Sequence, residues 1–323
     1  MPHHFCTWRC VAGCCLLSAW PVGGGARAAD APAAPAPAPL VDLSGPEYNP
    51  PDCPAWAKEE LPAWVKPFVG INGVTPATLR PRKPVLGSPT IKIDRYQANN
   101  AIYYRPETAA YLYKDYTPLP VKYTPGTLPT FEKIAAQYTA DCKTETDKAV
   151  ALLTKAMPAV FKHPGMPPCG PPTRPDRGLE DEAMLATGCG WCNEQARIFI
   201  RLCQVSGIQA RMVHLFGQNH TIAEFHADGR WALADASNFF VAAGADGKLL
   251  SAAQCHDRGA GQRAYAEAKQ RRMQELVKLP DEVLNLGTPE ATQKWREQTA
   301  KPFADELATR VCGFAVVNYP LPR

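Results

Sequence analysis

The sequence predicts an α+β fold with one buried helix followed along the chain by strands that include an antiparallel hairpin. The segment Cys192 to Ser206 has apolar residues at helical spacing on two sides, which is typical of a buried helix. Two strand-like segments, Ala210 to Phe216 and His220 to His226, follow it. The pair Asp228-Gly229 is then a strong signal for a two-residue hairpin, after which Arg230 to Ala234 returns antiparallel. These observations predict a buried helix that is followed along the chain by an antiparallel meander.

Further helices are expected on both sides of this centre. Thr130 to Cys142 and Thr146 to Phe161 are helical in pattern, and Thr144-x-x-Asp147 resembles a capping box at the start of the second. Leu179 to Ala186 is a third short helix, preceded by a proline-rich surface loop at 163–177. Toward the C-terminus, the sequence predicts helices over Ala260 to Leu279 and from Thr288-Pro289-Glu290, and a strand over Arg310 to Tyr319.

This pattern divides the chain into five parts. Residues 1–28 are expected to be a signal peptide, 29–54 a proline-rich arm, and 55–129 an irregular region with short strands such as Thr90 to Ile93. Residues 130–250 are the expected catalytic core, and 251–323 a mainly helical C-terminal extension. No internal repeat is visible.

The first residues favour export, to the periplasm or the outside of the cell. An apolar stretch from Cys10 to Val22 precedes Ala26-Arg27-Ala28, a small-x-small cleavage pattern, so the mature chain is expected to begin near Ala29. A lipid anchor at Cys14 is a minor alternative, because few apolar residues precede it. No later run is long and apolar enough to predict a membrane span.

The composition limits which classes of binding partner are expected and indicates whether the cysteines can form disulfides. The 323-residue chain has a formal net charge of +4 and no persistent basic block, so nucleic acid is not expected as a partner. Of its 12 cysteines, eight lie beyond the predicted leader, and an exported chain can oxidise them to disulfides. The sequence cannot give their connectivity, and it predicts no cofactor.

Three residues point to an activated thiol: Cys192, His220 and Asp235. Because a cysteine attacks as thiolate, its site must lower the thiol pKa. The predicted helix N-terminus at Cys192 and an imidazolium at His220 would both favour the anion. Asp235 is expected at the end of the strand antiparallel to the one that His220 begins, where it can orient the imidazole.

The surrounding motifs resemble the core of the transglutaminase-like superfamily, over about Leu179 to Asn238. The matching positions are Gly190, Cys192 and Ala196; Gly207, Ile208, Ala210 and Arg211; His220 and Glu224; and Trp231 and Asp235. Gln209, Thr221 and Ala236 depart from the family's usual residues, but none of these departures removes a reactive group.

The resemblance implies a papain-like arrangement, with the nucleophile at the N-terminus of a buried helix packed against a small antiparallel sheet. It also implies acyl transfer through a thioester, to water or to an amine. Cys192 would be the nucleophile, His220 the proton shuttle and Asp235 its orienting group. Trp191, Glu224 and Trp231 are candidates for supporting the site. Glu224 is expected to be a structural or a substrate-side carboxylate rather than a base, Trp231 to pack, and Arg211 to pair with an acid in the core. The expected substrate is a protein or peptide, with a cell-wall peptide as one candidate.

Several alternatives remain at this stage. Cys189-x-x-Cys192 also fits a thiol-disulfide oxidoreductase, or a reversible disulfide that holds the nucleophile inactive. A zinc site using these cysteines with His214, His220 or His226 lacks a complete ligand pattern, so no metal is predicted. Cys203 is expected to be a buried free thiol. The fold could also serve as a catalytically silent binding or scaffold module.

Overall fold

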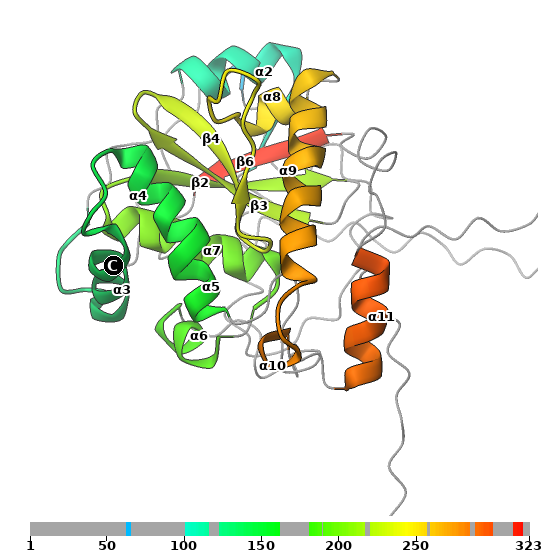
Figure 1. Cartoon of the computed structure of the whole chain (residues 1–323). Coiled ribbons are helices and arrows are strands. Elements are labelled where there is room, and N and C mark those ends of the chain that lie inside the picture. Colours follow the sequence, from blue (N-terminus) through cyan, green and yellow to red (C-terminus); the bar gives the residue numbers. More distant parts are fainter. Residues whose placement is uncertain are drawn as a thin grey trace, which may run out of the picture.

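The structure is a computed structural model of the 323-residue chain (Figure 1). It describes residues 63–65, 101–115, 123–161, 181–188, 190–216, 220–256, 259–284, 288–299 and the strand at 313–318. The predicted signal peptide, proline-rich arm, Thr90 to Ile93 strand and 163–177 loop, together with Cys189, lie outside the described residues.

The centre of the fold is an antiparallel sheet of six strands in the order β1-β6-β2-β3-β4-β5. All neighbouring strands run antiparallel. Their bounds are β1 Ile102–Tyr103, β2 Gln209–Phe216, β3 His220–Ala227, β4 Arg230–Asp235, β5 Phe240–Val241 and β6 Gly313–Asn318. The predicted meander is therefore confirmed as the three-strand unit β2-β3-β4.

The β3–β4 hairpin turns at the predicted pair. Asp228 and Gly229 both have positive φ, 49° and 76°, as the tightest two-residue hairpin turns require. The turn is also held from outside, because the Asp228 carboxylate accepts the Thr146 N–H at 3.1 Å and the Asp228 N–H donates to Glu145 at 3.1 Å. These bonds fix the hairpin tip against the start of a neighbouring helix.

The sheet extends beyond residues 130–250. The predicted C-terminal strand forms β6 and pairs with β2, while β1 pairs with β6 from the other side. The region expected to be irregular also contains the helix α2, Pro106–Ala110, and the π-helical turn η4, Tyr111–Asp115. Pro106 occupies the first helical turn, where its missing N–H costs no hydrogen bond. The prediction of irregular chain with short strands did not take this helix-start preference of proline into account.

Helix α7, Cys192–Val205, packs on β2 and β3. Its residues from Glu194 to Gln204 are all buried, as the two-sided apolar pattern predicted. The helix stops two residues before Gly207, whose φ of +76° allows the Gly207 N–H to reach the Gln204 carbonyl and the Ile208 N–H to reach the Cys203 carbonyl, at 3.0 and 2.9 Å. This Schellman ending leads the chain directly into β2.

Four more helical segments enclose α7 on the same face of the sheet: α3 Pro129–Thr139, α4 Glu145–Ala151, α5 Met157–Val160 and α6 Asp181–Thr187. Thr144 caps α4 through the Asp147 N–H at 3.0 Å, as predicted. The predicted continuous helix to Phe161 contains a π-helical turn, η5 Leu152–Ala156, just before Pro158. A wider turn suits this position because Pro158 has no N–H to donate.

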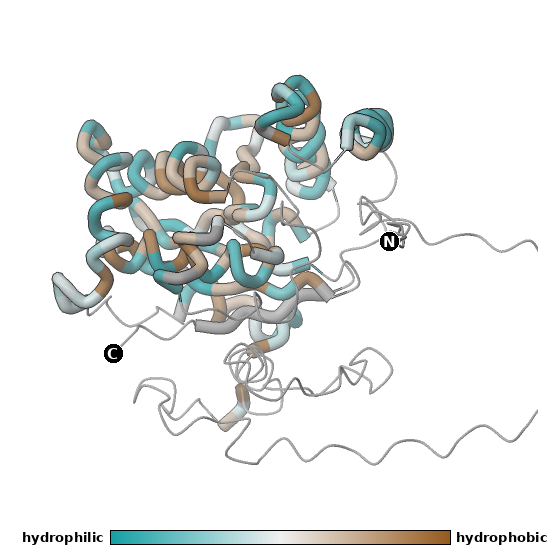
Figure 2. Tube along the Cα trace, turned by 90° about the horizontal axis from the view of Figure 1, so that it is seen from below, coloured by the Kyte–Doolittle hydropathy of each residue, from teal (hydrophilic) through white to brown (hydrophobic). Residues whose placement is uncertain are grey.

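A second apolar core lies on the opposite face of the sheet. There η4, α8 Ala252–His256 and α9 Ala260–Leu276 cover the side chains of Val213, Ile222 and Leu233. The chain continues into α10 Asp281–Leu284 and α11 Pro289–Thr299. Figure 2 shows apolar positions gathered where the central elements pack and hydrophilic positions along the outer helices. Among the described helices, none has both the length and the hydrophobicity needed to cross a bilayer.

Candidate active site

Cys192 is the first residue of α7. The Trp191 N–H donates to the Glu194 carboxylate at 2.7 Å, and Gln195 bonds through its amide nitrogen to the Gly190 carbonyl at 2.9 Å. A Cβ on Gly190 would lie 3.2 Å from both Phe161 and Glu194, so only glycine fits comfortably. The chain just before Cys192 is thus held tightly, and the thiol is placed at the positive end of the helix.

The Cys192 thiol is free and partly buried. Burial alone would raise its pKa, but the hydrogen bond and charge of His220 oppose this, together with the backbone N–H groups of Thr221 and Asn193. The combined effect lowers the thiol pKa from its ordinary value. The site therefore favours the thiolate, which is the nucleophilic form of cysteine.

His220 begins β3 and bonds through Nε2 to Asp235 Oδ2 at 3.0 Å. Burial by itself would lower the imidazole pKa, yet the charge and hydrogen bond of Asp235, followed by those of Cys192, raise it to about 10. Because Nε2 is engaged by the carboxylate, Nδ1 is the ring nitrogen left to exchange a proton with the thiol. His220 therefore lies between a buried carboxylate and a thiol whose pKa is lowered.

The Asp235 carboxylate is completely buried and surrounded by donors. Oδ1 accepts the N–H groups of Ser237 and Asn238, both at 3.1 Å. Oδ2 accepts His220, the Asn238 side-chain amide at 3.1 Å and the Tyr265 hydroxyl at 3.3 Å. Burial would raise the carboxyl pKa, but the His220 charge and these bonds, with the Lys269 charge, lower it to about 2.

The strand register explains how these residues meet. Ala223 pairs with Ala234, so Asp235 stands opposite position 222, on the same face of the sheet as His220 two residues away. Helix α7 packs on the other face, and its N-terminus brings Cys192 to the end of β3 where His220 lies. The three residues predicted from the sequence are therefore brought together at one end of the β3–β4 pair.

A family model described as the transglutaminase-like superfamily matches residues 132–236. These residues form a transglutaminase-like domain. The match includes Cys192, His220 and Asp235, and it confirms the resemblance expected from the motifs. Comparison with curated proteins and with solved structures gives no match. The α+β architecture, with helices on a small antiparallel sheet, agrees with the family.

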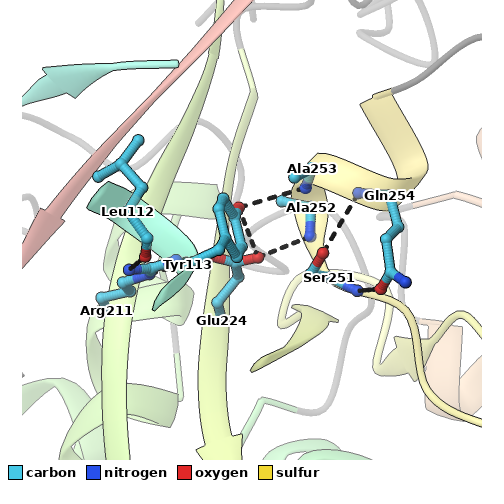
Figure 3. Close-up of polar contacts among 8 residues, drawn as sticks. All are labelled: Leu112, Tyr113, Arg211, Glu224, Ser251, Ala252, Ala253 and Gln254. Atoms are coloured by element: carbon cyan, nitrogen blue, oxygen red, sulfur yellow. Dashed lines mark hydrogen bonds and ion pairs between the residues drawn. The ribbon is translucent and has the colours of Figure 1, made fainter. Parts of the chain in front are cut away.

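Glu224 belongs to a separate buried network that joins the matched residues to η4 and α8 (Figure 3). Its Oε2 atom lies 3.0 Å from Arg211 Nε and 2.9 Å from Arg211 Nη2. Its Oε1 atom accepts the Tyr113 hydroxyl at 3.0 Å and the Ala252 N–H at 2.6 Å. Glu224 thus connects β2, η4 and α8 through its two carboxylate oxygens. Arg211 pairs with a buried acid, as predicted.

The two tryptophans differ in their contacts. Trp231 is buried and lies against the Arg211 guanidinium, whose central carbon is 3.6 Å from the ring centroid. It supports the Glu224 network rather than contacting the thiol. Trp191 is the residue before α7 and shapes the entry of the chain to Cys192.

The cysteines and histidines considered as metal ligands can be compared only where the structure describes them, which leaves out Cys189. Within the described residues, no group of three or more potential ligands is close enough to hold a metal ion. His214 faces the α7 side of the sheet and bonds to Thr221, whereas His220 and His226 share the other face. Cys142, Cys203 and Cys255 are free thiols, and burial raises the Cys203 pKa, as expected for a buried thiol.

Three supporting residues were not predicted from the sequence. Glu194 stands three residues after Trp191, a spacing that suits a helix N-terminus and offered a local signal. Asn238 lies three residues after Asp235 and bonds back to it, as turn asparagines commonly do. Tyr265 lies thirty residues away on α9, and nothing in the local pattern indicates its contact with Asp235.

Proposed function

We propose that the chain is a thiol-dependent amide acyl-transfer enzyme that acts through a Cys192 thioester. The observation that carries the proposal is the buried His220–Asp235 bond at 3.0 Å beside a partly exposed free thiol at a helix N-terminus. The transglutaminase-like family match supports it, because that family often contains enzymes with this chemistry. Cys192 is the nucleophile, His220 the acid and base, and Asp235 the orienting group.

In the first half-reaction, the Cys192 thiolate attacks the carbonyl carbon of an amide. The backbone N–H of Cys192, which has no acceptor within its own helix turn, is a candidate donor to the oxyanion. The imidazolium of His220 then gives its Nδ1 proton to the leaving amine as the C–N bond breaks. The products are a thioester on Cys192, a free amine and a neutral imidazole.

In the second half-reaction, water or a second amine attacks the thioester. Neutral His220 accepts the proton of the attacking group, and the C–S bond breaks to return the thiolate. Asp235 remains ionised throughout, because its five donors hold its pKa low. We favour hydrolysis over transamidation because no sequence motif indicates a dedicated site for a second amine.

The proposed substrate is a protein or peptide, and the proposed location is outside the cytoplasm. A peptide carbonyl or side-chain amide suits a nucleophile of this kind, and a cell-wall peptide would be available to an exported enzyme. Export rests on the sequence pattern at residues 1–28. Sequencing the N-terminus of the protein recovered from the envelope tests it, with a start near Ala29 expected and an intact leader contradicting it.

Thiol reactivity tests the proposal directly. Mild alkylation of the folded chain, followed by peptide mass spectrometry, compares the rate at Cys192 with that at Cys142, which is partly buried like Cys192. Cys192 should react faster at neutral pH, and His220→Ala should slow it. His226→Ala is the matched control because His226 lies on the same strand and face, and it should leave the rate unchanged.

A second measurement concerns the thioester. Incubation with a panel of peptide amides should add an acyl mass to Cys192 that hydroxylamine removes, and Asp235→Asn should reduce its formation. If Cys192 reacts no faster than Cys142 and His220→Ala does not change its rate, the enzyme proposal is wrong. A silent binding module would then be the better description.

A further inference from the structure

Helix α9 lies beyond the family match, yet one of its faces contacts the segment that carries Asp235. Tyr265, Lys269 and Arg272 are spaced i, i+4 and i+7, so they project from the same side of the helix. The family match ends at residue 236, and α9 begins at Ala260. The helix therefore adds contacts to the site that the matched residues 132–236 do not contain.

The contacts of this face are specific. The Tyr265 hydroxyl lies 3.3 Å from Asp235 Oδ2, at the long end for such a bond, and the Tyr265 ring packs on Phe240 at 5.4 Å between centroids. Tyr265 is only 3% exposed. The hydroxyl is therefore placed at the carboxylate by a packed ring, and little water is available to replace it.

Arg272, further along α9 than Tyr265, contacts the turn that follows Asp235. Its Nε donates to the Asn238 carbonyl at 3.1 Å, and its guanidinium lies 6.0 Å from the Phe239 ring centroid. Phe239 has a φ of +57°, which a non-glycine residue adopts at an energetic cost. Asn238, between this residue and Asp235, donates to both carboxylate oxygens. Arg272 thus steadies the turn from which Asn238 contacts Asp235.

We propose that Tyr265 is a positioning residue of the active site, which holds Asp235 Oδ2 toward His220, and that α9 is an integral part of the catalytic centre. His220 Nε2, Asn238 and Tyr265 all bond to Oδ2. The carboxylate oxygen is therefore confined from three directions, and His220 is presented to Cys192 in one orientation. This inference rests on the proposed function, because it assigns Tyr265 a role in the same proton relay.

Tyr265→Phe tests the role with little disturbance, because the ring and its packing on Phe240 remain. Two quantities are measured on the full chain: the alkylation rate of Cys192 at neutral pH, and the low-field proton NMR resonance of the His220 Nε2–H. Tyr265→Phe should slow alkylation several-fold and move the resonance. Arg272→Gln should change both in the same direction, by less.

Tyr113→Phe is the matched control, because it removes a hydroxyl from a different buried carboxylate, Glu224. It should leave the resonance and the Cys192 rate unchanged. If Tyr265→Phe leaves either quantity unchanged, or lowers only the melting temperature, Tyr265 is merely structural and the inference is overturned. If the wild type itself shows neither preferential Cys192 labelling nor a His220-dependent resonance, the proposed function fails instead.

Discussion

Removing the charge of Glu224 should destabilise the protein strongly without affecting the thiol. Glu224 and Arg211 are both fully buried, and the carboxylate also accepts bonds from Tyr113 and Ala252. Glu224→Gln keeps the size of the side chain but leaves the Arg211 guanidinium without its counter-charge. Removing one partner of a buried ion pair typically costs about 3–5 kcal/mol.

The structure places this variant near the lower end of that range. Arg211 retains its bond to the Leu112 carbonyl at 2.8 Å and its contact with the Trp231 ring. We therefore expect a loss of about 3 kcal/mol in the free energy of unfolding. Tyr113→Phe removes one hydrogen bond to the charged group and should cost about 1.5 kcal/mol.

Urea denaturation at neutral pH measures these free energies, and Cys192 alkylation of the folded variants measures the site. The double variant Arg211→Met with Glu224→Met removes both charges and should recover much of the loss, because well-packed apolar residues can replace a buried ion pair. A loss below about 1 kcal/mol for Glu224→Gln would refute the reasoning. So would a double variant less stable than the single one.

Two further changes test other parts of the fold. Gly190→Ala should cost about 1–3 kcal/mol in urea denaturation, because its Cβ would crowd Phe161 and Glu194 at 3.2 Å, and an unchanged midpoint would contradict this crowding. Burial lowers the His214 pKa to about 4, so between pH 6.5 and 4 the unfolded chain binds a proton that the folded chain does not. The free energy of unfolding should fall over this pH window by at most about 3 kcal/mol in the wild type, and by less in His214→Gln. Urea denaturation at pH 6.5 and at pH 4 measures both falls. An equal fall in the wild type and the variant would exclude His214 as the cause.

The parts of the fold that depend on local sequence were predictable. The Asp228-Gly229 turn needs two residues that tolerate positive φ, and the end of the helix before Gly207 needs one. The residue types at these positions therefore predict both features. The two-sided apolar pattern after Cys192 correctly indicated a helix covered on all sides. The proximity of Cys192, His220 and Asp235 was also predictable, because Cys192 starts a helix and the other two lie at adjoining ends of one hairpin.

Most of the features that the sequence did not predict depend on contacts between segments that are distant along the chain. β6 was expected as a strand, but its place between β1 and β2 follows from packing and not from its own residues. Tyr265 reaches Asp235 only because α9 crosses the β5 side of the sheet, and no local pattern encodes that crossing. The π-helical turn before Pro158 was missed because apolar periodicity does not distinguish it from an α-helix.

The most direct test of the central claim is the ultraviolet absorbance of the thiolate as a function of pH, taken as the difference between the wild type and Cys192→Ala. Because His220 carries a positive charge up to a pKa of about 10, the Cys192 thiolate should already be present well below the ordinary thiol pKa of about 8.5. In His220→Ala the signal should move to higher pH. A wild-type signal that first appears near or above pH 8.5, unchanged by His220→Ala, would contradict a thiolate–imidazolium pair.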